Sequence, residues 1–564
     1  MDPEKKTRTW LPLWIAIGVA LGIFIGNQYA KFGTSMQVGG LGKIDAVLNY
    51  INKSYVDTVN IRQLIEDALP NIVQELDPHS TYITAQEMKR VNEDLEGHFS
   101  GIGVSFFVMK DTIVVTSIVP GGPSEAAGIY PWDRIVSVND TLVAGTKINN
   151  ENVLTRLRGE KGTEVKLGIK RNNSRNLQNI TVTRGDIPMN SIPAAFMETD
   201  QTGYIKVSTF GFNTFNEFIS ALSKLKSQGA RSFIIDLRGN SGGALEIVVA
   251  MVNEFLERGD LIVYADGRNF PRTDNYANGS GTSKNDEVVI LIDELSASAS
   301  EIFAGAIQDH DRGLVIGRRS FGKGLVQSQR NFPDGSAIRL TVARYFTPSG
   351  RSIQRKYEKG KHNDYEMEAV NRYLQGDYVN IDTTLDLTPF QTKGGRIVYG
   401  GDGIMPDIFV KRDTIGINSY YNSLFNNNIV QEYAMIYSDK NRDKLKVLES
   451  TERLHSYLLR QPLIMNLVSY ADSLGIRRRP YYIQESYDLL ENQLIAFIVR
   501  NFFGEEGFYS VLSQDDALIN RAIQLIERGM ASPESVVKEK YNTVAKNNIN
   551  YEGKAFGFFP VMIA

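Results

Sequence analysis

The chain has 564 residues, of which 42% are hydrophobic and 23% are charged, a balance typical of several globular domains and unlike that of a disordered chain. With 62 Lys and Arg against 65 Asp and Glu, the net charge of -3 gives no electrostatic basis for nucleic acid as a principal partner. Cysteine is absent and the 5 histidines form no metal-binding pair, which excludes disulfides and a cysteine nucleophile and argues against a zinc hydrolase.

Residues 1–30 are expected to hold a cytoplasmic tip and a transmembrane anchor. Lys5, Lys6 and Arg8 precede an apolar run over residues 10–26, which as a helix spans roughly 25 Å, slightly less than a bilayer core of about 30 Å. The positive-inside rule keeps the N-terminus cytoplasmic and places the rest of the chain in an exported compartment such as the periplasm. A cleaved signal peptide is the alternative, but no small-x-small cleavage site follows the apolar run.

Residues 31–96 are expected to form a short linker, over 31–40, and then two or three helices, because apolar residues recur at helical spacing from Leu41 to Glu75. The segment Leu76–Ser80 interrupts this pattern with a proline. Residues 97–185 change to short β-branched runs separated by Gly, Pro, Asn and Asp, which predicts a small β-rich module.

Two glycines precede an apolar strand in this module, within Gly101-Ile102-Gly103-Val104. Backbone N–H groups in such a turn can bind a carboxylate, and the strand edge beyond it can accept an added peptide strand, although an ordinary turn is the commoner explanation. The segments Pro120–Ile129 and Asp133–Asn139 make the module resemble a PDZ domain. This resemblance implies that Gly101, Ile102, Gly103 and Val104 bind the C-terminal tails of proteins. Trp132 and Asp140 depart from the family, since each stands where a glycine is usual.

Residues 186–412 alternate short strands with helices, which predicts a mainly parallel, buried sheet. The pattern indicates a polar loop over Arg268–Asp286 and an antiparallel pair of strands around Asp334. Beyond Asp413 the pattern is helical again, and residues 413–564 are expected to form a helical C-terminal domain without a chemical motif.

A strand over Val288–Ile292 is followed by three serines, Ser296, Ser298 and Ser300, and then by an apolar helix. A serine at a strand-to-helix turn is well placed for nucleophilic attack, because the helix N-terminus favours negative charge that develops nearby. The alternative is helix capping, since Ser298 and Glu301 have the spacing of a capping box. The residues themselves do not select one of the three serines.

Two residues are candidates for the general base. His310, flanked by two aspartates, suggests Ser/His/Asp chemistry, but it lies at the far end of the same predicted helix, roughly 15 Å from the serines. Lys323 lies between two glycines and near apolar residues that would desolvate its amine and lower its pKa, which favours it as the base. The alternatives for a lone lysine in a glycine loop are solvent exposure and phosphate contact.

Several segments together resemble the carboxyl-terminal processing, or tail-specific, peptidases, which are serine proteases with a Ser/Lys catalytic pair. The resemblance covers about residues 41–410 and is carried by Leu76–Tyr82, Asp236–Gly243, Ser296–Ile302, Phe321–Gln327, Asp334–Ser336, Tyr345–Gly350 and Gly403–Asp407. It implies a multidomain α/β protein with a crotonase/ClpP-like protease core, an inserted PDZ domain, an N-terminal transmembrane helix and a helical C-terminal domain.

The resemblance also implies the roles of single residues. The family's interval of 25 positions between serine and lysine selects Ser298 as the nucleophile and Lys323 as the general base, and Gln327 as the residue that orients the lysine amine. The oxyanion hole would be formed by the amide of Ala299 with Gly242 or Gly243. Asp309 matches an aspartate sometimes counted as a third catalytic member, and a structural role is favoured for it here.

We therefore expect a membrane-anchored serine endopeptidase that cleaves exported proteins near their C-termini and needs no cofactor or metal. Its partners would be protein tails and the membrane, and the C-terminal domain could mediate homo-oligomerisation or bind an adaptor. One alternative is a catalytically inactive, membrane-tethered peptide-binding scaffold. Another is a crotonase-like acyl-CoA enzyme, which the export segment disfavours.

Overall fold

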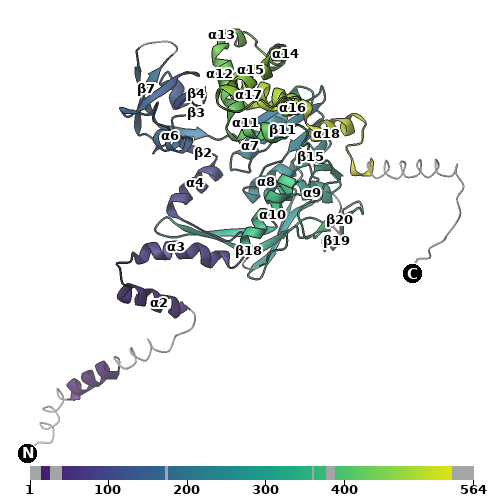
Figure 1. Ribbon diagram of the computed structural model, residues 1–564. Coiled ribbons are helices and arrows are strands. Elements are labelled where there is room, and N and C mark those ends of the chain that lie inside the picture. The colour runs from purple at the N-terminus through teal and green to yellow at the C-terminus, as the bar shows by residue number, and fades with distance from the viewer. Residues whose placement is uncertain (1–13, 26–40, 172–175, 359–360, 376–387, 536–564) are drawn as a thin grey trace, which may run out of the picture. The chain divides into compact units, whose positions relative to one another are not determined.

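The computed structural model describes residues 14–25, 41–171, 176–358, 361–375 and 388–535 (Figure 1). These residues form two units, which divide between Glu75 and Leu76. The first unit contains a helix over residues 14–25 and the helices α2 (Leu41–Ser54) and α3 (Ile61–Gln74). These helices agree with the helical spacing of the apolar residues in the sequence.

The expected membrane helix over residues 10–26 is described only at residues 14–25, and its other residues lie outside the described parts of the chain. The expected linker over residues 31–40 also lies outside them. Within the described ranges, no helix combines the length and the apolar character that a membrane span requires.

The second unit is built on a six-stranded sheet that is parallel except for its first edge strand. Its order is β10 (Ala194–Met197), β11 (Thr202–Lys206), β12 (Ser232–Asp236), β15 (Glu287–Ile292), β16 (Leu314–Gly317) and β21 (Ile408–Phe409). Because successive strand residues point to opposite faces, Val288, Ile290 and Ile292 pack on one face and Val289 and Leu291 on the other. The first face is covered by α7 (Thr214–Ser227), α8 (Leu245–Asn253) and α9 (Ala299–Asp309).

A second, antiparallel sheet lies beside this core and holds part of the candidate site. Its order is β1 (Thr81–Ile83), β18 (Ala337–Phe346), β13 (Leu261–Gly267) and β14 (Phe270–Tyr276), and β17 (Leu325–Asn331) also pairs with β18. The prediction of a polar loop over Arg268–Asp286 is wrong, because β14 occupies part of it. This strand exposes most of its side chains, so its sequence lacks the apolar alternation that marks a half-buried strand.

The β-rich module has the strands expected from its sequence. Its sheet contains β3 (Val104–Met109), β4 (Thr112–Ile118), β5 (Arg134–Val138), β6 (Thr141–Leu142), β7 (Glu164–Lys170) and β8 (Gln178–Thr183), with the helices α5 (Pro123–Ala126) and α6 (Asn150–Leu157). β3 is an edge strand of this sheet. β2 (His98–Gly101) pairs with β9 (Gly185–Pro188), so the two chain segments that join the module to the core run side by side after α4 (Ala85–Glu96).

The C-terminal region is helical, as the sequence predicts. It contains α11 (Ser419–Asn426), α12 (Ile429–Lys440), α13 (Arg442–Leu445), α14 (Thr451–Leu458), α15 (Leu463–Ser473), α16 (Pro480–Glu485), α17 (Tyr487–Leu512) and α18 (Ala517–Glu527). Residues 536–564 of the expected helical domain lie outside the described residues. The last helix among the described residues, α18, packs Leu518, Ile519 and Leu525 on the second face of the six-stranded sheet. The core sheet is therefore covered on one face by a helix that follows the core by about a hundred residues in the sequence.

Trp132 joins the β-rich module to the C-terminal helices. Its side chain is 7% exposed and packs in a cluster with Met435 of α12 and Phe502 of α17, with the two aromatic ring centroids 6.1 Å apart. An ion pair between Arg134 and Asp439, at 2.6 Å, lies across the same interface. The φ angle of Trp132 is +75°, a backbone conformation that favours glycine, which explains why glycine is usual at this position. In this chain the indole side chain instead forms part of the contact between the module and the C-terminal helices.

Candidate active site

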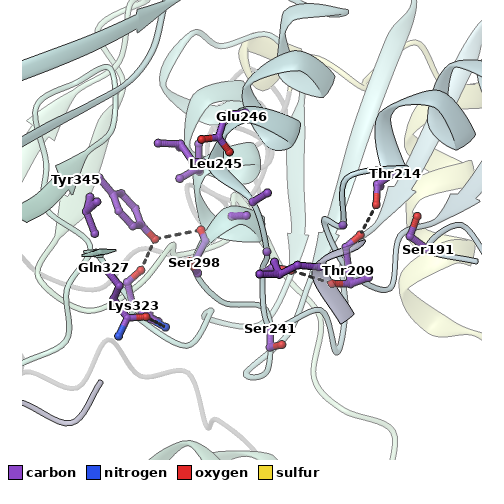
Figure 2. Close-up of a pocket in the computed structure, with 18 of the residues that line it drawn as sticks. Ser191, Thr209, Thr214, Ser241, Leu245, Glu246, Ser298, Lys323, Gln327 and Tyr345 are labelled. Atoms are coloured by element: carbon purple, nitrogen blue, oxygen red, sulfur yellow. Dashed lines mark hydrogen bonds between the residues drawn. The ribbon is translucent and has the colours of Figure 1, made fainter. Parts of the chain in front are cut away.

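One cavity of about 940 Å³ brings together the residues predicted for catalysis. Its lining includes Ser298, Ala299, Lys323, Gln327, Gly242 and Gly243, and Figure 2 shows Ser298, Lys323 and Gln327 on the same side of it. These residues come from the turn before α9, the loop before β17, β17 itself and the loop after β12. The sequence separates them by up to 85 positions, and the two sheets bring them to one place.

Ser298 occupies the turn between β15 and α9 with a φ of +55° and a ψ of −111°. Such a backbone conformation is strained for a residue with a side chain, and it is often found where a side chain must be presented to a cavity. Ser296 and Ser300 are fully buried, and their hydroxyls donate to the backbone carbonyls of residues 237 and 240, each at 2.9 Å. Of the three serines, only Ser298 lines the cavity.

The loop after β12 supplies a backbone donor next to this turn. The N–H of Gly242 donates to the side-chain oxygen of Asn240 at 2.9 Å, whereas the N–H groups of Gly243 and Ala299 have no hydrogen-bond partner among the described residues. Gly243 has a φ of +151°, and a Cβ atom at this position would lie 2.3 Å from the carbonyl oxygen of Phe210. The two free donors are thus Gly243 and Ala299, and only glycine fits at the first of them.

Lys323 lies in the loop before β17, and its amine donates to Oε1 of Gln327 at 3.1 Å. The amide of Gln327 is oriented in turn, because its Nε2 donates to the backbone carbonyl of His79. Burial lowers the pKa of the Lys323 amine, and the positive charge of Arg339 lowers it further, while the charges of nearby acidic groups oppose both effects. A lowered pKa increases the fraction of neutral amine, the form that accepts a proton.

The hydroxyl of Ser298 and the amine of Lys323 face the same cavity without a direct hydrogen bond between them in the described structure. Catalytic hydrogen bonds of this kind often form only when a substrate closes the site. The amine donates instead to Oε1 of Gln327, four residues along the chain.

Glu301 connects the two segments that carry these side chains. Its buried carboxylate accepts hydrogen bonds from the backbone N–H groups of Ser298 at 2.8 Å and Lys323 at 2.9 Å. It also accepts from the N–H of Gly322 at 2.7 Å and from the hydroxyl of Ser320 at 2.5 Å. Burial raises the pKa of this carboxyl group, and these donors oppose the rise. The sequence indicated a capping box at this position and gave no sign of the contacts to residues 320–323.

Tyr345 of β18 is a second connection that the sequence analysis did not assign. Its hydroxyl lies within hydrogen-bonding distance of the backbone carbonyls of Ser298, at 3.0 Å, and of Lys323, as the dashed lines in Figure 2 show. In the sequence, the segment Tyr345–Gly350 carries only the resemblance to the family. The fold gives its first residue a place beside both catalytic candidates.

Two other candidates lie away from the cavity, at the far end of α9. Asp309 is fully buried, forms an ion pair with Arg351 at 2.7 Å and accepts from the N–H of Ser349 at 3.0 Å, which fits a structural role. His310 places its Nε2 2.7 Å from the carbonyl oxygen of Leu261. Neither residue lines the cavity that contains Ser298, so the geometry does not assemble a Ser/His/Asp triad there.

The glycines predicted to bind peptide tails lie at the start of the edge strand β3. Gly101 ends β2, Val104 begins β3, and Gly103 has a φ of +75°. A Cβ atom on Gly103 would lie 2.9 Å from the side chain of Ile187, so both the backbone conformation and the packing require glycine. The loop and the adjoining strand edge have the form that strand addition needs.

Comparisons with known proteins agree with this architecture. Residues 201–367 match peptidase family S41, residues 100–182 match the PDZ domain family, and residues 420–504 match a family of unknown function. A probable CtpA-like serine protease of Staphylococcus haemolyticus (strain JCSC1435) is 36% identical over 366 residues, which cover 62% of this chain and 72% of that protein. A probable CtpA-like serine protease of Staphylococcus aureus (strain MRSA252) is 33% identical over 368 residues, 63% of this chain and 73% of that protein.

Two solved structures are also similar in sequence. The photosystem II D1 C-terminal processing protease is 26% identical, with 54% of this chain and 88% of that chain covered and a TM-score of 0.31. The PDZ domain of the carboxy-terminal protease from Vibrio cholerae, in complex with peptide, is 25% identical, with 16% and 99% covered and a TM-score of 0.15. An S41 peptidase core with an inserted PDZ domain thus defines the class of this protein. The chain belongs to the family of C-terminal processing serine proteases.

Proposed function

We propose that the protein is an endopeptidase that cleaves other proteins near their C-termini, with Ser298 as the nucleophile and Lys323 as the general base. The observation that carries the proposal is the shared cavity. It contains a strained serine turn, two unengaged backbone donors and a lysine whose pKa is lowered. This combination supplies the three things that acyl transfer requires, namely a nucleophile, a base and a site for the oxyanion.

In the proposed reaction, the Ser298 hydroxyl attacks the scissile carbonyl carbon while the neutral Lys323 amine takes its proton. The N–H groups of Ala299 and Gly243 stabilise the negative charge on the carbonyl oxygen, which is typically worth several kcal/mol in total. The lysine then gives its proton to the leaving amine, the C–N bond breaks, and an ester to Ser298 remains. Water hydrolyses this ester in the same two steps, with Lys323 again accepting and returning a proton.

The PDZ domain would bind the C-terminal tail of the substrate. In this proposal the tail adds as a strand to the free edge of β3, and its carboxylate lies against the N–H groups of the loop Gly101–Val104. The peptide-bound PDZ domain of the Vibrio cholerae protease supports a peptide as the ligand. We further propose that the apolar segment over residues 10–26 anchors the chain and that the described domains act on exported proteins, a proposal that rests on the sequence alone.

Purified protein tests the proposed chemistry with a tail-bearing model substrate. The variant Ser298→Ala should lose cleavage completely and should still bind the substrate tail, and Lys323→Met should behave in the same way. Thermal unfolding of Ser298→Ala should match the wild type, and Lys323→Met should lose little stability, because Oε1 of Gln327, which loses its donor, is only partly buried. Unchanged cleavage by the Ser298→Ala variant would exclude the assignment. A wild type that binds tails and cleaves none would favour the inactive scaffold.

A further inference from the structure

Arg339 is a half-buried arginine in the catalytic cavity that the proposed reaction does not use. It lies on β18, opposite Gln329 of β17, and its Nη2 donates to Oε1 of Gln329 at 2.9 Å. Within the described ranges of the chain, it has no carboxylate partner within 4.0 Å. Arginine stays protonated in proteins, so this side chain brings a positive charge into the cavity without a neutralising neighbour.

Other charged groups near Arg339 do not supply that partner. Among the described residues that line the cavity, the charged ones are Lys323, Arg339 and Glu246, and Glu246 forms no ion pair or hydrogen bond with Arg339 there. Asp77 lies near the strand pair, but its oxygens accept from Ser80, from the N–H of His79 and from Thr341. A partly desolvated guanidinium is stabilised when its remaining N–H groups bind a carboxylate, most strongly in the bidentate geometry that arginine allows.

The register of β17 and β18 places Arg339 relative to the reacting atoms. Gln327 pairs with Thr341 and Gln329 with Arg339, and directly opposed residues share one face of a sheet. The polar side chains therefore form a row along this face of the sheet. It runs from the Lys323 amine to Gln327 and then to the pair of Gln329 and Arg339. Two residues of a strand span about 7 Å, which is the approximate distance from Gln327 to the next pair of side chains along this row.

The direction of this row decides which part of a substrate it meets. The lysine that takes the serine proton also gives a proton to the leaving amine, so the leaving side of the peptide lies against Lys323 and the row that extends from it. An extended peptide covers about 3.3 Å per residue. A group about 7 Å beyond Gln327 therefore meets the substrate roughly two or three residues after the scissile bond.

We infer that Arg339 binds a carboxylate of the substrate two or three residues after the scissile bond and so selects where the chain is cut. This inference rests on the proposed function and deepens it by naming a subsite on the leaving side. The carboxylate has two sources, the free C-terminus of a short tail or the side chain of an aspartate or glutamate at that position. In the first case the enzyme trims a fixed number of residues, and in the second it cuts before an acidic residue.

Peptides of one common sequence distinguish these cases. One series has one to six residues after the scissile bond and ends in a free carboxylate, and a second series is identical but ends in an amide. A third series ends in an amide and carries glutamate at the second or third position. The enzymes are the wild type, Arg339→Gln, Arg339→Lys and the matched control Arg344→Gln, which removes an exposed arginine of the same strand that does not line the cavity.

For the wild type we expect kcat/KM to be about tenfold or more higher with the carboxylate than with its amide at a length of two or three residues, or higher with glutamate than without it. In Arg339→Gln that ratio should fall to about one. Arg339→Lys should keep part of it, and Arg344→Gln should keep all of it. The ratio is taken within each enzyme, so a change in the pKa of Lys323 cancels.

Three results would overturn the inference. The first is a wild type that cleaves each carboxylate, amide and glutamate peptide equally well. The second is a wild-type preference that persists in Arg339→Gln with the rates on all peptides unchanged, which would assign the carboxylate to the PDZ domain. The third is an equal loss with all peptides in Arg339→Gln, which would leave only an effect on Lys323. A wild type that cleaves no peptide would instead overturn the proposed function, and this inference with it.

Discussion

The backbone N–H groups of Ser298 and Lys323 donate to the same atom, Oε2 of Glu301, at 2.8 Å and 2.9 Å. Two chain segments 25 residues apart are thereby held at a fixed separation by one buried carboxylate. The hydroxyl of Tyr345 lies within hydrogen-bonding distance of the backbone carbonyls of the same two residues and can donate to either. The relative position of nucleophile and base is thus set by the backbone, which leaves their side chains free to act.

Replacing Glu301 should therefore affect catalysis more than substrate binding. In Glu301→Gln the side chain keeps its size, but an amide cannot accept from all four donors, so the two segments should separate slightly. We expect kcat to fall by about 10- to 100-fold with little change in KM, since small misplacements at this distance are costly. Steady-state kinetics with a model peptide would measure this.

The variant Glu301→Ala provides the comparison. It leaves several buried N–H groups without an acceptor, at a cost of about 1–3 kcal/mol each, and should lower the thermal stability of the whole protein. If Glu301→Gln retained full kcat while Glu301→Ala unfolded, the carboxylate would have a structural role only.

The pH dependence of the reaction should report the Lys323 amine. Its pKa is lowered from the ordinary value of 10.5, and only the neutral amine is a base, so kcat/KM should rise with pH and level off above an inflection that lies below 10.5. Removing the positive charge in Arg339→Gln makes protonation of the lysine easier and should move this inflection to higher pH. A pH profile of both enzymes on an amide-ended peptide would test this, and an inflection that stays in place would show that Arg339 has no electrostatic effect on the lysine.

The serine turn could be predicted from the sequence because the strand, the turn and the helix α9 follow each other directly. The choice of Ser298, Lys323 and Gln327 depended on the spacing in the family that the sequence resembles, since the local pattern fits three serines equally well. The residues that were missed act across long separations. Arg339 enters the cavity through the pairing of β17 with β18, which no local pattern reveals. The choice between Gly242 and Gly243 depended on which N–H group Asn240 engages, a detail that only coordinates show.

The unusual tryptophan of the PDZ domain leads to a prediction about domain docking. Trp132→Gly should relieve the strained backbone and remove the aromatic contact with Phe502. Loss of a buried indole typically costs about 3–5 kcal/mol, so the contact between the PDZ domain and the C-terminal helices should loosen. Hydrogen exchange in the full-length protein should increase in β5 and α12, on the two sides of the interface. The core strand β15 should exchange as before, and equal exchange at β5 and α12 in both proteins would contradict the docking role.

Asp516, at the start of α18, should influence the position of a loop in the active site. This residue is the N-cap of α18, where its Oδ1 accepts from the N–H groups of Leu518 and Ile519, and its other oxygen binds Arg238 at 2.7 Å. Arg238 also pairs with the buried Asp236 at the end of β12, directly before the loop that contains Gly243. The helix that covers the core sheet is thus tied to the loop proposed to hold the oxyanion.

Two substitutions of Asp516 separate its two roles. Asn is as good an N-cap as Asp, so Asp516→Asn should keep α18 in place and weaken only the partly exposed ion pair with Arg238, for a loss of no more than about 1 kcal/mol in stability. Asp516→Ala removes both contacts and should cost about 1 kcal/mol more. If the ion pair positions the loop, kcat should fall in both variants by a similar factor while only the alanine variant loses further stability. The free energy of unfolding and kcat should be measured for both variants. If kcat falls only in Asp516→Ala, the variant that also loses further stability, then Asp516 acts only through the packing of α18.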